Sequence, residues 1–338
     1  MKPASKKVTL SAMVTEMSSA LRDVFVKQPN AWIERARERM RDLPKTNFDL
    51  GCGFADKGQW FDAMFRFRVV LFLKPDYPNA WYNLGCCYFR AGKYPQAATA
   101  LRTALKQNPA NNNAKFMLAS VEGDSLPPEQ RPQHMPKEMI SGFFTSVAQT
   151  YDISEANSRY QAGRVIHELL KPLVTIANPK LLDLGCGTGI VSRPWRQSAA
   201  SIVGVDITNA MLTQANKATH AEKKLFDALH EADVIQLPAD LPSADVVLLV
   251  NVVQFVGNLA GVMQQVAMRL IPQGVFVITL ESYSGKGGYG LNVETGRFGH
   301  SVAYVKQVAE VAGLKLLKEA KVELYPGLPQ DAVVFGKR

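Results

Sequence analysis

Two short apolar runs in the second half of the chain predict neighbouring buried strands. Residues 181–184 read Leu-Leu-Asp-Leu, and residues 201–206 read Ser-Ile-Val-Gly-Val-Asp. A turn with three glycines directly follows the first run: Gly185, Gly187 and Gly189. An apolar pattern compatible with a helix begins at Ile190. A strand, a tight glycine turn and a helix N-terminus in this order form a cradle for a ligand, because glycine lets the backbone approach it closely.

The spacing of the glycines and of the next acid limits the classes of ligand that the cradle can bind. Asp206 ends the second run 21 residues after Gly185, where a doubly wound sheet places an acid that binds the two hydroxyls of a ribose. A dinucleotide fingerprint requires G-x-G-x-x-G, whereas here the third glycine comes one residue early and Ile190 holds its place. No Lys-Ser/Thr pair follows the glycines, which excludes a P-loop. An oxidoreductase is therefore the weakest alternative.

The apolar pattern of the first half repeats with a period of 34 residues. Glycine, aromatic, alanine and proline positions recur in step, as in the pairs Gly51 and Gly85, Phe54 and Tyr88, Ala63 and Ala97, Phe67 and Leu101, and Pro75 and Pro109. This period and pattern resemble the tetratricopeptide repeat, a helix-turn-helix unit. We expect the small residues to let paired helices approach, the large ones to fill the gaps, and the prolines to end each second helix.

These patterns divide the chain into four segments. The repeats are predicted to span 47–120, as two whole units and a fragment that begins at Ala114. Because about three units are needed for a stable stack, residues 1–46 are expected to supply capping helices. Residues 121–138 contain four prolines and are predicted to form a semi-rigid linker. Residues 139–338 then form a second domain.

The second domain resembles the class I S-adenosylmethionine-dependent methyltransferases, because Asp183, the three glycines and Asp206 match their pattern D-x-G-x-G-x-G followed by a ribose acid. The resemblance implies an α/β Rossmann-like domain with a seven-stranded, mostly parallel sheet and an antiparallel last strand. Further segments resemble the first helix (143–152), the acid after the third strand (232–233), the fourth and fifth strands (245–250 and 275–280) and the last two strands (315–324 and 332–336). With its repeats, the chain resembles the bacterial group of predicted methyltransferases that contain tetratricopeptide repeats.

The resemblance implies S-adenosyl-L-methionine as methyl donor, released as S-adenosyl-L-homocysteine, and a role for each site residue. Gly185, Gly187 and Gly189 pass close to the donor, Asp183 orients its amino group, and Asp206 accepts from both ribose hydroxyls. The remaining expected contacts are Ile207 on one face of the adenine, Asp233 on its amino group with Ala232 beside it, Asn251 near the methyl group, and Tyr151 closing over the donor from the first helix.

Two residues near the end of a glycine-rich loop are candidates for catalysis. Methyl transfer from a sulfonium is an in-line displacement that needs alignment and exclusion of water, without a covalent intermediate. His300 has a reference pKa suited to a general base, and Arg297 can hold an anionic substrate. The alternative is that Ser301 caps a helix over 302–312 and that Arg297 and His300 brace the loop. The sequence leaves both readings open.

Charge and cysteine content limit the partners and the location. The net charge of +9 lies mostly in residues 1–138, with 21 lysines and arginines against 13 acids, compared with 18 against 17 in the rest. This excess attracts an acidic protein, nucleic acid or an anionic membrane surface, or else forms a solvated face. No run approaches the ~18 apolar residues of a membrane span. The four cysteines lack a metal-binding spacing, so we expect no metal and a cytoplasmic location.

The sequence therefore predicts transfer of a methyl group to an unidentified acceptor, for which we expect a small molecule. Residues 251–254 read Asn-Val-Val-Gln and lack the proline-proline-aromatic signature of amino-group methylases of adenine or glutamine, so a nucleic-acid target is disfavoured. Repeats usually present a concave face to a partner protein, or they pack on the catalytic domain. The alternatives are a protein methyltransferase whose repeats recruit the substrate, and a catalytically silent scaffold that binds the donor.

Overall fold

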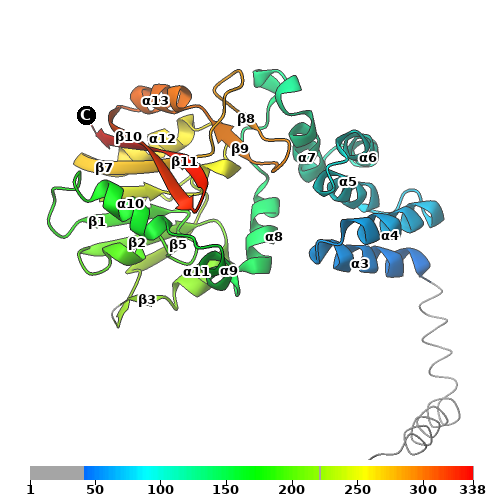
Figure 1. Cartoon of the computed structure of the whole chain (residues 1–338), viewed down its shortest axis with the longest axis horizontal. Helices are drawn as coiled ribbons and strands as arrows, with labels where there is room; N and C mark the ends of the chain where they lie inside the picture. The colour runs from blue at the N-terminus through cyan, green and yellow to red at the C-terminus, as the bar shows by residue number, and fades with distance from the viewer. Residues whose placement is uncertain (1–41, 221, 338) are drawn as a thin grey trace, which may run out of the picture. The chain divides into compact units, whose positions relative to one another are not determined.

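The computed structural model describes residues 42–220 and 222–337 (Figure 1). They form two compact units, and the boundary between the units in the sequence lies between Gln107 and Asn108. The expected capping segment, 1–46, lies almost wholly outside the described residues. Its last residues instead begin the first described helix at Leu43, where the Asp42 carboxylate accepts a hydrogen bond from the backbone N–H of Lys45 at 3.0 Å. This is a helix N-cap, which satisfies one of the otherwise unpaired N–H groups of the first turn.

The first unit consists of paired helices, as its 34-residue period predicts: α3 (Leu43–Asp56), α4 (Trp60–Leu73), α5 (Ala80–Arg90) and α6 (Tyr94–Gln107). The helices of each pair approach each other at the predicted small and large residues. A Cβ atom on Gly51 would lie 2.8 Å from Phe67 Cε1, and one on Gly85 would lie 2.7 Å from Leu101 Cγ. Since such distances are below van der Waals contact, glycine is required at both positions.

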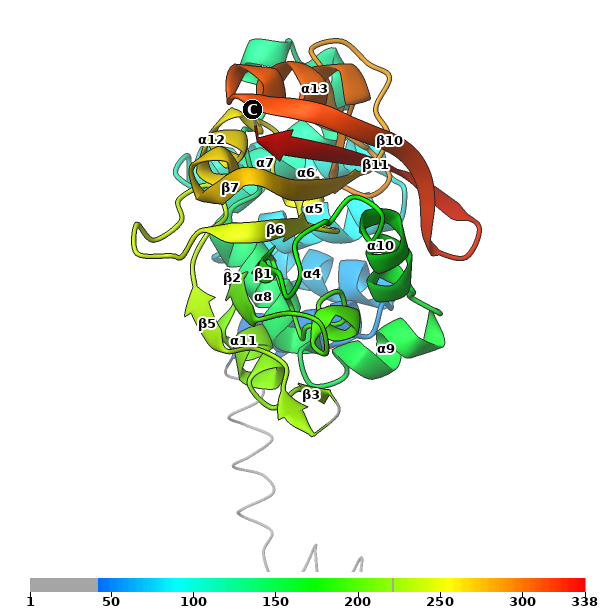
Figure 2. The ribbon, with the colours of Figure 1, turned by 90° about the vertical axis from the view of Figure 1, so that its left-hand side faces the viewer.

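The second unit is built on a seven-stranded sheet in the order β10-β11-β7-β6-β1-β2-β5 (Figure 2). Its strands are β1 (Lys180–Leu184), β2 (Ser201–Asp206), β5 (Ala228–Glu231), β6 (Ala244–Leu249), β7 (Leu270–Leu280), β10 (Leu314–Tyr325) and β11 (Leu328–Lys337). Only β11 runs antiparallel to its neighbours, β7 and β10. The predicted fold class, including the antiparallel last strand, is confirmed.

Helices cover both faces of this sheet, so its strands are apolar on both sides. Along β1, Leu182 and Leu184 pack with the apolar residues of two helices on one face, and Leu181 packs on the other face. The first face is covered by α12 (Ala260–Arg269) and α13 (Val302–Val311), and the second by α10 (Ala162–Leu170) and α11 (Asn209–Ala215). Buried side chains on both faces form the core of the unit.

Shorter elements surround the sheet. The helices are α7 (Asn112–Glu122), α8 (Lys137–Val147) and α9 (Tyr151–Asn157), with 3₁₀ turns η1 (Gly123–Ser125), η2 (Pro128–Gln130), η3 (Arg193–Trp195) and η4 (Val253–Phe255). Two hairpins add β3 (Thr219–His220) with β4 (Lys223–Lys224), and β8 (Tyr289–Leu291) with β9 (Phe298–His300). The segment predicted as the first helix of the domain is divided into α8 and α9 by a turn at 148–150.

The proline-rich segment 121–138 is bonded to the second unit instead of separating two domains. The Arg131 guanidinium is buried and donates to the Tyr283 hydroxyl and to the carbonyls of Lys286 and Tyr289, at 2.6 to 2.8 Å. The third-repeat fragment, now α7, packs Phe116 against Phe298, with ring centroids 5.9 Å apart. The boundary between compact units therefore lies at Gln107, before the fragment, and not within the predicted linker.

The glycine turn does not lead into an α-helix, contrary to the pattern that begins at Ile190. Only the 3₁₀ turn η3 follows it. Pro194 lies in the second turn of the expected helix, where it has no N–H to donate and its ring clashes with the preceding turn. The ligand cradle therefore consists of the turn itself, without a helix dipole behind it.

Candidate functional site

A cavity with about 780 Å³ of empty space, its open mouth included, lies beside the glycine turn, and we call it the glycine-turn cavity. Seven of the ten residues expected to contact a ligand line it: Tyr151, Gly185, Gly187, Asp206, Ile207, Asp233 and Asn251. Six of them lie at or shortly after the ends of β1, β2, β5 and β6, at the edge where ligands bind in doubly wound sheets, and the seventh, Tyr151, begins α9. The structure thus brings together residues that are spread over 100 positions of the sequence.

The glycines of the turn serve different purposes. All three have positive φ angles, which favour glycine. A Cβ atom on Gly185 would lie 2.3 Å from Val252 Cγ2, and one on Gly189 would lie 2.4 Å from Leu225 Cδ2. A Cβ atom on Gly187 would meet nothing within 4 Å and would occupy open space at the cavity wall. Gly185 and Gly189 therefore allow close packing, whereas Gly187 keeps the cavity open.

Asp206 presents a buried carboxylate to the cavity. Its Oδ1 accepts a hydrogen bond from Thr208 N and its Oδ2 one from Gly187 N, both at 2.9 Å. Burial raises the pKa of Asp206, and these two hydrogen bonds oppose the rise. An ionised carboxylate has about four lone-pair positions. Because the carboxylate also lines the cavity, it can accept hydrogen bonds from ligand hydroxyls there, which fits the expected ribose.

Asp183, Gly189 and Ala232 lie behind the cavity wall and do not line it. The Asp183 carboxylate is 2% exposed and accepts a hydrogen bond from Ser192 Oγ at 2.6 Å. Burial, together with repulsion from Asp206, raises the pKa of Asp183 to about 7, although the Ser192 hydroxyl acts in the opposite direction. The backbone N–H of Ala232 donates to the carbonyl of Asp206 at 3.0 Å. These three residues therefore support the wall of the glycine-turn cavity without lining it.

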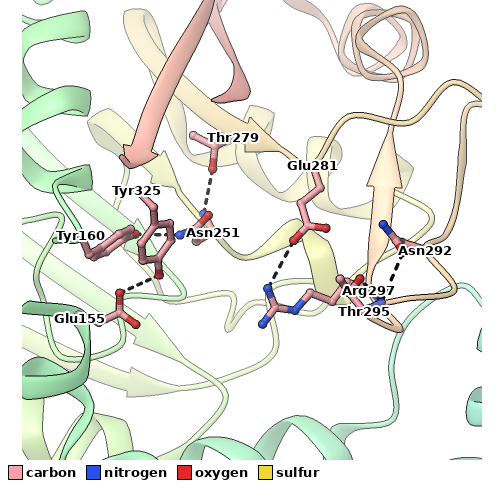
Figure 3. A network of polar contacts seen from close by, with 9 residues as sticks. All are labelled: Glu155, Tyr160, Asn251, Thr279, Glu281, Asn292, Thr295, Arg297 and Tyr325. Atoms are coloured by element: carbon pink, nitrogen blue, oxygen red, sulfur yellow. Dashed lines mark hydrogen bonds and ion pairs between the residues drawn. The ribbon is translucent and has the colours of Figure 1, made fainter. Parts of the chain in front are cut away.

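Asn251, directly after β6, has a strained backbone conformation at the cavity. Its φ angle is +57°, which is uncommon for a residue other than glycine. The strain is held by two hydrogen bonds: Asn251 N donates to Thr279 Oγ1 at 2.9 Å, and its Nδ2 donates to the Tyr160 hydroxyl at 3.1 Å (Figure 3). The side chain is therefore fixed in position before any ligand arrives.

A second cavity adjoins the first, and we call it the tyrosine cavity. Its empty space, open mouth included, is about 760 Å³, and it shares four lining residues with the glycine-turn cavity: Phe144, Tyr151, Asn251 and Phe255. Its other polar and charged side chains include Glu155, Gln254, Glu281, Arg297 and Tyr325. Because the two cavities share a wall at Asn251, they form a two-part site.

The polar network of the tyrosine cavity joins distant segments (Figure 3). Tyr325, at the end of β10, donates from its hydroxyl to Glu155 Oε2 at 2.7 Å. The Tyr325 ring packs on Tyr160, with ring centroids 4.7 Å apart, and Tyr160 in turn accepts from Asn251. Burial raises the pKa values of Tyr160 and Tyr325 above the ordinary tyrosine value. Both hydroxyls therefore remain protonated at neutral pH.

Sequence reasoning missed Glu155 and Tyr160. The Tyr151 and Glu155 side chains are four residues apart and thus lie on one face of α9. This spacing is the signal that would have pointed to Glu155. Asp152 holds the same helix against the glycine turn, because its carboxylate accepts from Thr188 Oγ1 and pairs with Arg193.

The structure places Arg297 in the tyrosine cavity, as part of the loop that links β8 and β9. Its guanidinium pairs with Glu281 at 3.5 Å (Figure 3), a long contact between partly exposed groups. A tight turn fixes its backbone: Arg297 N donates to Thr295 Oγ1 at 3.2 Å, and the Arg297 carbonyl accepts from Asn292 N at 2.8 Å. The cation is thus held at the cavity while keeping donors for an anionic group.

His300 is not brought to either cavity. Its side chain is fully buried, and its ring lies beside the rings of Tyr289 and Tyr304. Nε2 bonds the Gly257 carbonyl at 3.0 Å, and Nδ1 has no hydrogen-bond partner within the described part of the chain. Burial lowers the pKa of His300 to about 4, against the opposing effect of the Gly257 carbonyl. Ser301 caps α13 through Tyr304 N, so this geometry fits the alternative in which His300 braces the loop.

Two negative findings concern the described residues, 42–220 and 222–337. In these ranges no group of three or more histidine, cysteine or acidic side chains is arranged to hold a metal ion. Over the same ranges, no helix combines the length and the apolar character that crossing a bilayer requires.

Comparisons with known proteins find a matching segment in each half of the chain. Residues 182–278 match the methyltransferase domain family, and residues 78–111 match the tetratricopeptide repeat. Among curated relatives, a malonyl-acyl-carrier-protein O-methyltransferase of Serratia marcescens is 27% identical over 143 residues, which are 42% of this chain and 52% of the relative. A ubiquinone biosynthesis O-methyltransferase of a Bradyrhizobium species is 28% identical over 121 residues, or 36% of this chain and 47% of the relative.

Among solved structures, the magnesium protoporphyrin IX methyltransferase of Synechocystis, with bound S-adenosylhomocysteine, aligns with 60% of this chain and all of its own. Its identity is 14% and its TM-score 0.49. The chain spans about half the length of the curated relatives named above. The family matches show that the second unit contains a methyltransferase domain, and that residues 78–111, most of which belong to the first unit, form a tetratricopeptide repeat.

Proposed function

We propose that this chain transfers a methyl group from S-adenosylmethionine to a small-molecule acceptor bound in the tyrosine cavity. The observation that carries this proposal is that all the lining residues of both cavities belong to the second unit. A site complete within one unit needs no repeat to assemble it. Both relatives are named as O-methyltransferases, one of malonyl-acyl-carrier protein and one of ubiquinone biosynthesis, which supports an oxygen atom as acceptor.

The residues of the glycine-turn cavity fit the donor. The Asp206 carboxylate lines the cavity and accepts from the ribose hydroxyls, and Gly187 leaves room beside it. Asp233 and Ile207 line the portion of the cavity assigned to the adenine, and Asn251 stands where the two cavities meet. When bound, the donor supplies a methyl group on a positively charged sulfur.

The protein contributes by aligning the donor with the acceptor and by shielding both from water. Phe144, Tyr151 and Phe255 line both cavities and exclude water from the place where they join. Phe144 packs edge-to-face on Tyr151 and on Phe255, with ring centroids 6.3 and 5.7 Å apart. Arg297 holds an anionic portion of the acceptor, because a guanidinium is a cation that presents several hydrogen-bond donors in a planar fork. A fixed acceptor beside the methyl group replaces a bimolecular encounter by an intramolecular one.

We further propose that the repeats bind a partner protein and that the reaction takes place in the cytoplasm. Repeat units usually offer a concave surface to a peptide or a protein. All four cysteines are free thiols, which suits a reducing compartment.

A labelled-methyl experiment tests this proposal. Donor with a labelled methyl group is incubated with cell extract and either the full chain or residues 108–338, with Asp206→Ala as the blank. The truncation begins at Asn108 because a start at 139 would remove Arg131 and Phe116, which pack within the unit. We expect label in the small-molecule fraction with both proteins. Label in protein that disappears on truncation would favour substrate recruitment by the repeats, and no label above the blank would favour a silent scaffold.

Arg297→Gln sharpens the same assay. Because the cavity has one arginine, its loss is expected to raise the KM for the acceptor about 10- to 100-fold, as for a lost charge-assisted hydrogen bond. Affinity for S-adenosylhomocysteine, measured by calorimetry, should stay within about threefold. An unchanged KM would remove Arg297 from acceptor binding.

A further inference from the structure

We propose that Glu155 is the general base of the reaction, positioned by Tyr325, and that the acceptor is a hydroxyl or amine that must lose a proton. This inference rests on the methyl transfer proposed above and names both the base and the class of acceptor. A carboxylate acceptor would need no base, because it is already ionised at neutral pH. The assignment moves the role considered for His300 to a residue that lines the tyrosine cavity.

The composition of the cavity leaves Glu155 as the acceptor of the proton. The titratable side chains that line the tyrosine cavity are Tyr151, Glu155, Glu281, Arg297 and Tyr325. Arginine has no acceptor atom and cannot take up the proton, and Glu281 is paired with Arg297. Burial raises the pKa of both tyrosines, so they remain protonated. Of the two carboxylates that line this cavity, Glu281 forms an ion pair with Arg297, whereas Glu155 accepts its hydrogen bond from the neutral Tyr325 hydroxyl.

Glu155 is held rigidly from two sides. Within its own helix, Asp152 bonds Thr188 and Arg193 and so ties α9 to the glycine turn. From the sheet, Tyr325 donates to Glu155 Oε2 at 2.7 Å, and its ring is packed on Tyr160 (Figure 3). This hydrogen bond occupies one position on one oxygen, and the carboxylate keeps further lone pairs for the acceptor's proton. A base fixed in this way needs no reorganisation when the acceptor binds.

The surroundings of Glu155 raise its pKa, which suits the role of a general base. The groups that face it are Tyr151 and Asp152 on its own helix, Tyr160 after it, Arg297 from the loop before β9 and Tyr325 from β10. Burial raises the pKa of Glu155, with a smaller contribution from Asp152, whereas the Tyr325 hydrogen bond and Arg297 oppose the rise. A base whose pKa lies closer to neutral is more effective than an exposed carboxylate.

The step balances as a proton transfer coupled to displacement. A lone pair on the acceptor oxygen or nitrogen forms the new bond to the methyl carbon. The carbon–sulfur bond of the donor breaks, and its electron pair stays on sulfur, which becomes the neutral thioether of S-adenosylhomocysteine. The acceptor's proton moves to Glu155, which releases it to solvent after the product leaves.

The test uses the full chain, donor labelled in the methyl group and the low-molecular-mass filtrate of a cell extract as acceptor source. Glu155→Gln should lower label transfer at least about 100-fold, the usual contribution of a general base. Its affinity for S-adenosylhomocysteine should stay within about threefold of the wild type. Glu168→Gln, an exposed residue of α10 that pairs with Arg164, is the matched control and should transfer label as the wild type does.

Tyr325→Phe separates positioning from mere folding. It removes a hydrogen bond that stabilises the Glu155 carboxylate, so the pKa of Glu155 rises further. The acid limb of the pH–rate profile should therefore move to higher pH, with a loss of about 10-fold near neutral pH that shrinks in alkaline buffer. A loss that does not depend on pH would overturn the positioning role of Tyr325.

The labelled product identifies the acceptor class directly. Alkali hydrolyses a methyl ester and releases volatile labelled methanol, whereas a methyl ether or an N-methyl group resists it. We expect the label to stay in the product. Release as methanol, or transfer by Glu155→Gln within about threefold of the wild type, would overturn the base while leaving the methyl transfer intact. If the wild-type chain binds S-adenosylhomocysteine but transfers no label above the Asp206→Ala blank, the proposed function fails first, and the base with it.

Discussion

The glycine-turn cavity and the tyrosine cavity share a wall but are built from the sequence in different ways. The first is lined by turns that directly follow the ends of parallel strands, so each strand brings its ligand contact with it. The second joins α9, the start of β9 and the ends of β7 and β10, which are as far apart as Glu155 and Tyr325 in the sequence. Under the proposed function, this difference means that donor binding belongs to the sheet, whereas acceptor selection belongs to the additions around it.

This contrast predicts that damage to one cavity leaves the other's function intact. Asp206→Asn gives the largest effect. It removes the charge from two hydrogen bonds to ribose hydroxyls, each worth about 1.5 to 3 kcal/mol. Affinity for S-adenosylhomocysteine should therefore fall at least about 100-fold, as measured by isothermal calorimetry on a variant whose melting temperature shows that it folds.

The matched control for this variant is Glu231→Gln. Glu231 ends β5 in register with Asp206 and pairs with Asn209, but it does not line the cavity. Its affinity should equal that of the wild type. If Asp206→Asn bound S-adenosylhomocysteine within about threefold of the wild type, the assignment of Asp206 to the ribose would be lost.

A smaller effect is expected from Gly187→Ala, for which the repeat unit offers a control. Gly187 and Gly92 both have positive φ angles, +53° and +70°, and a Cβ atom on either would meet no neighbour within 4 Å. Both substitutions to alanine should cost about 1 kcal/mol of folding stability. Only Gly187 lines the cavity, so Gly187→Ala alone should weaken S-adenosylhomocysteine binding, by about 10-fold. Equal affinities for the two variants would mean that the ligand does not approach this part of the turn.

The sequence predicted the sheet and seven of the residues that line the glycine-turn cavity, because the strongest of those signals are local. A strand, its glycines and the next strand's acid lie within 26 residues, from Leu181 to Asp206. The missing helix after Ile190 reflects the effect of one residue, Pro194, on an otherwise helical pattern. Likewise, the prolines of 121–138 suggested a linker, since the pattern does not reveal that Arg131 is buried among carbonyls of a distant loop.

The tyrosine cavity was beyond the sequence because its chemistry arises from tertiary contacts. Neither Glu155 nor Tyr325 belongs to a motif, and their hydrogen bond exists because α9 and the end of β10 meet. His300 was attractive for the opposite reason. Its reference pKa suits a base, but the reference value holds for a solvated ring, and burial among Tyr289, Tyr304 and the Gly257 carbonyl changes it.

The smallest effect on turnover is expected from His300→Gln, which can keep a hydrogen bond to the Gly257 carbonyl. Methyl transfer should stay within about twofold of the wild type, because His300 lines neither cavity. The substitution should instead change how the free energy of unfolding depends on pH. The pKa of His300 is lowered from 6.5 to about 4 on folding, so between these values the unfolded chain binds a proton that the folded chain does not. Stability due to His300 is thus present above pH 6.5 and is lost as the pH falls toward 4, by up to about 3 kcal/mol.

The free energy of unfolding is measured by urea titration at a series of pH values for the wild type and for His300→Gln. The quantity compared is the difference between the two proteins at each pH. A difference is needed because Asp183 acts with the opposite sign: its pKa is raised from 3.8 to about 7 on folding, so its contribution is lost as the pH rises through this range. The Asp183 contribution is common to both proteins and cancels, which leaves a term that decreases from pH 6.5 to 4. A flat difference would show that the His300 ring titrates normally and is accessible, and a loss of turnover beyond 10-fold in a stable His300→Gln protein would return this residue to the catalytic candidates.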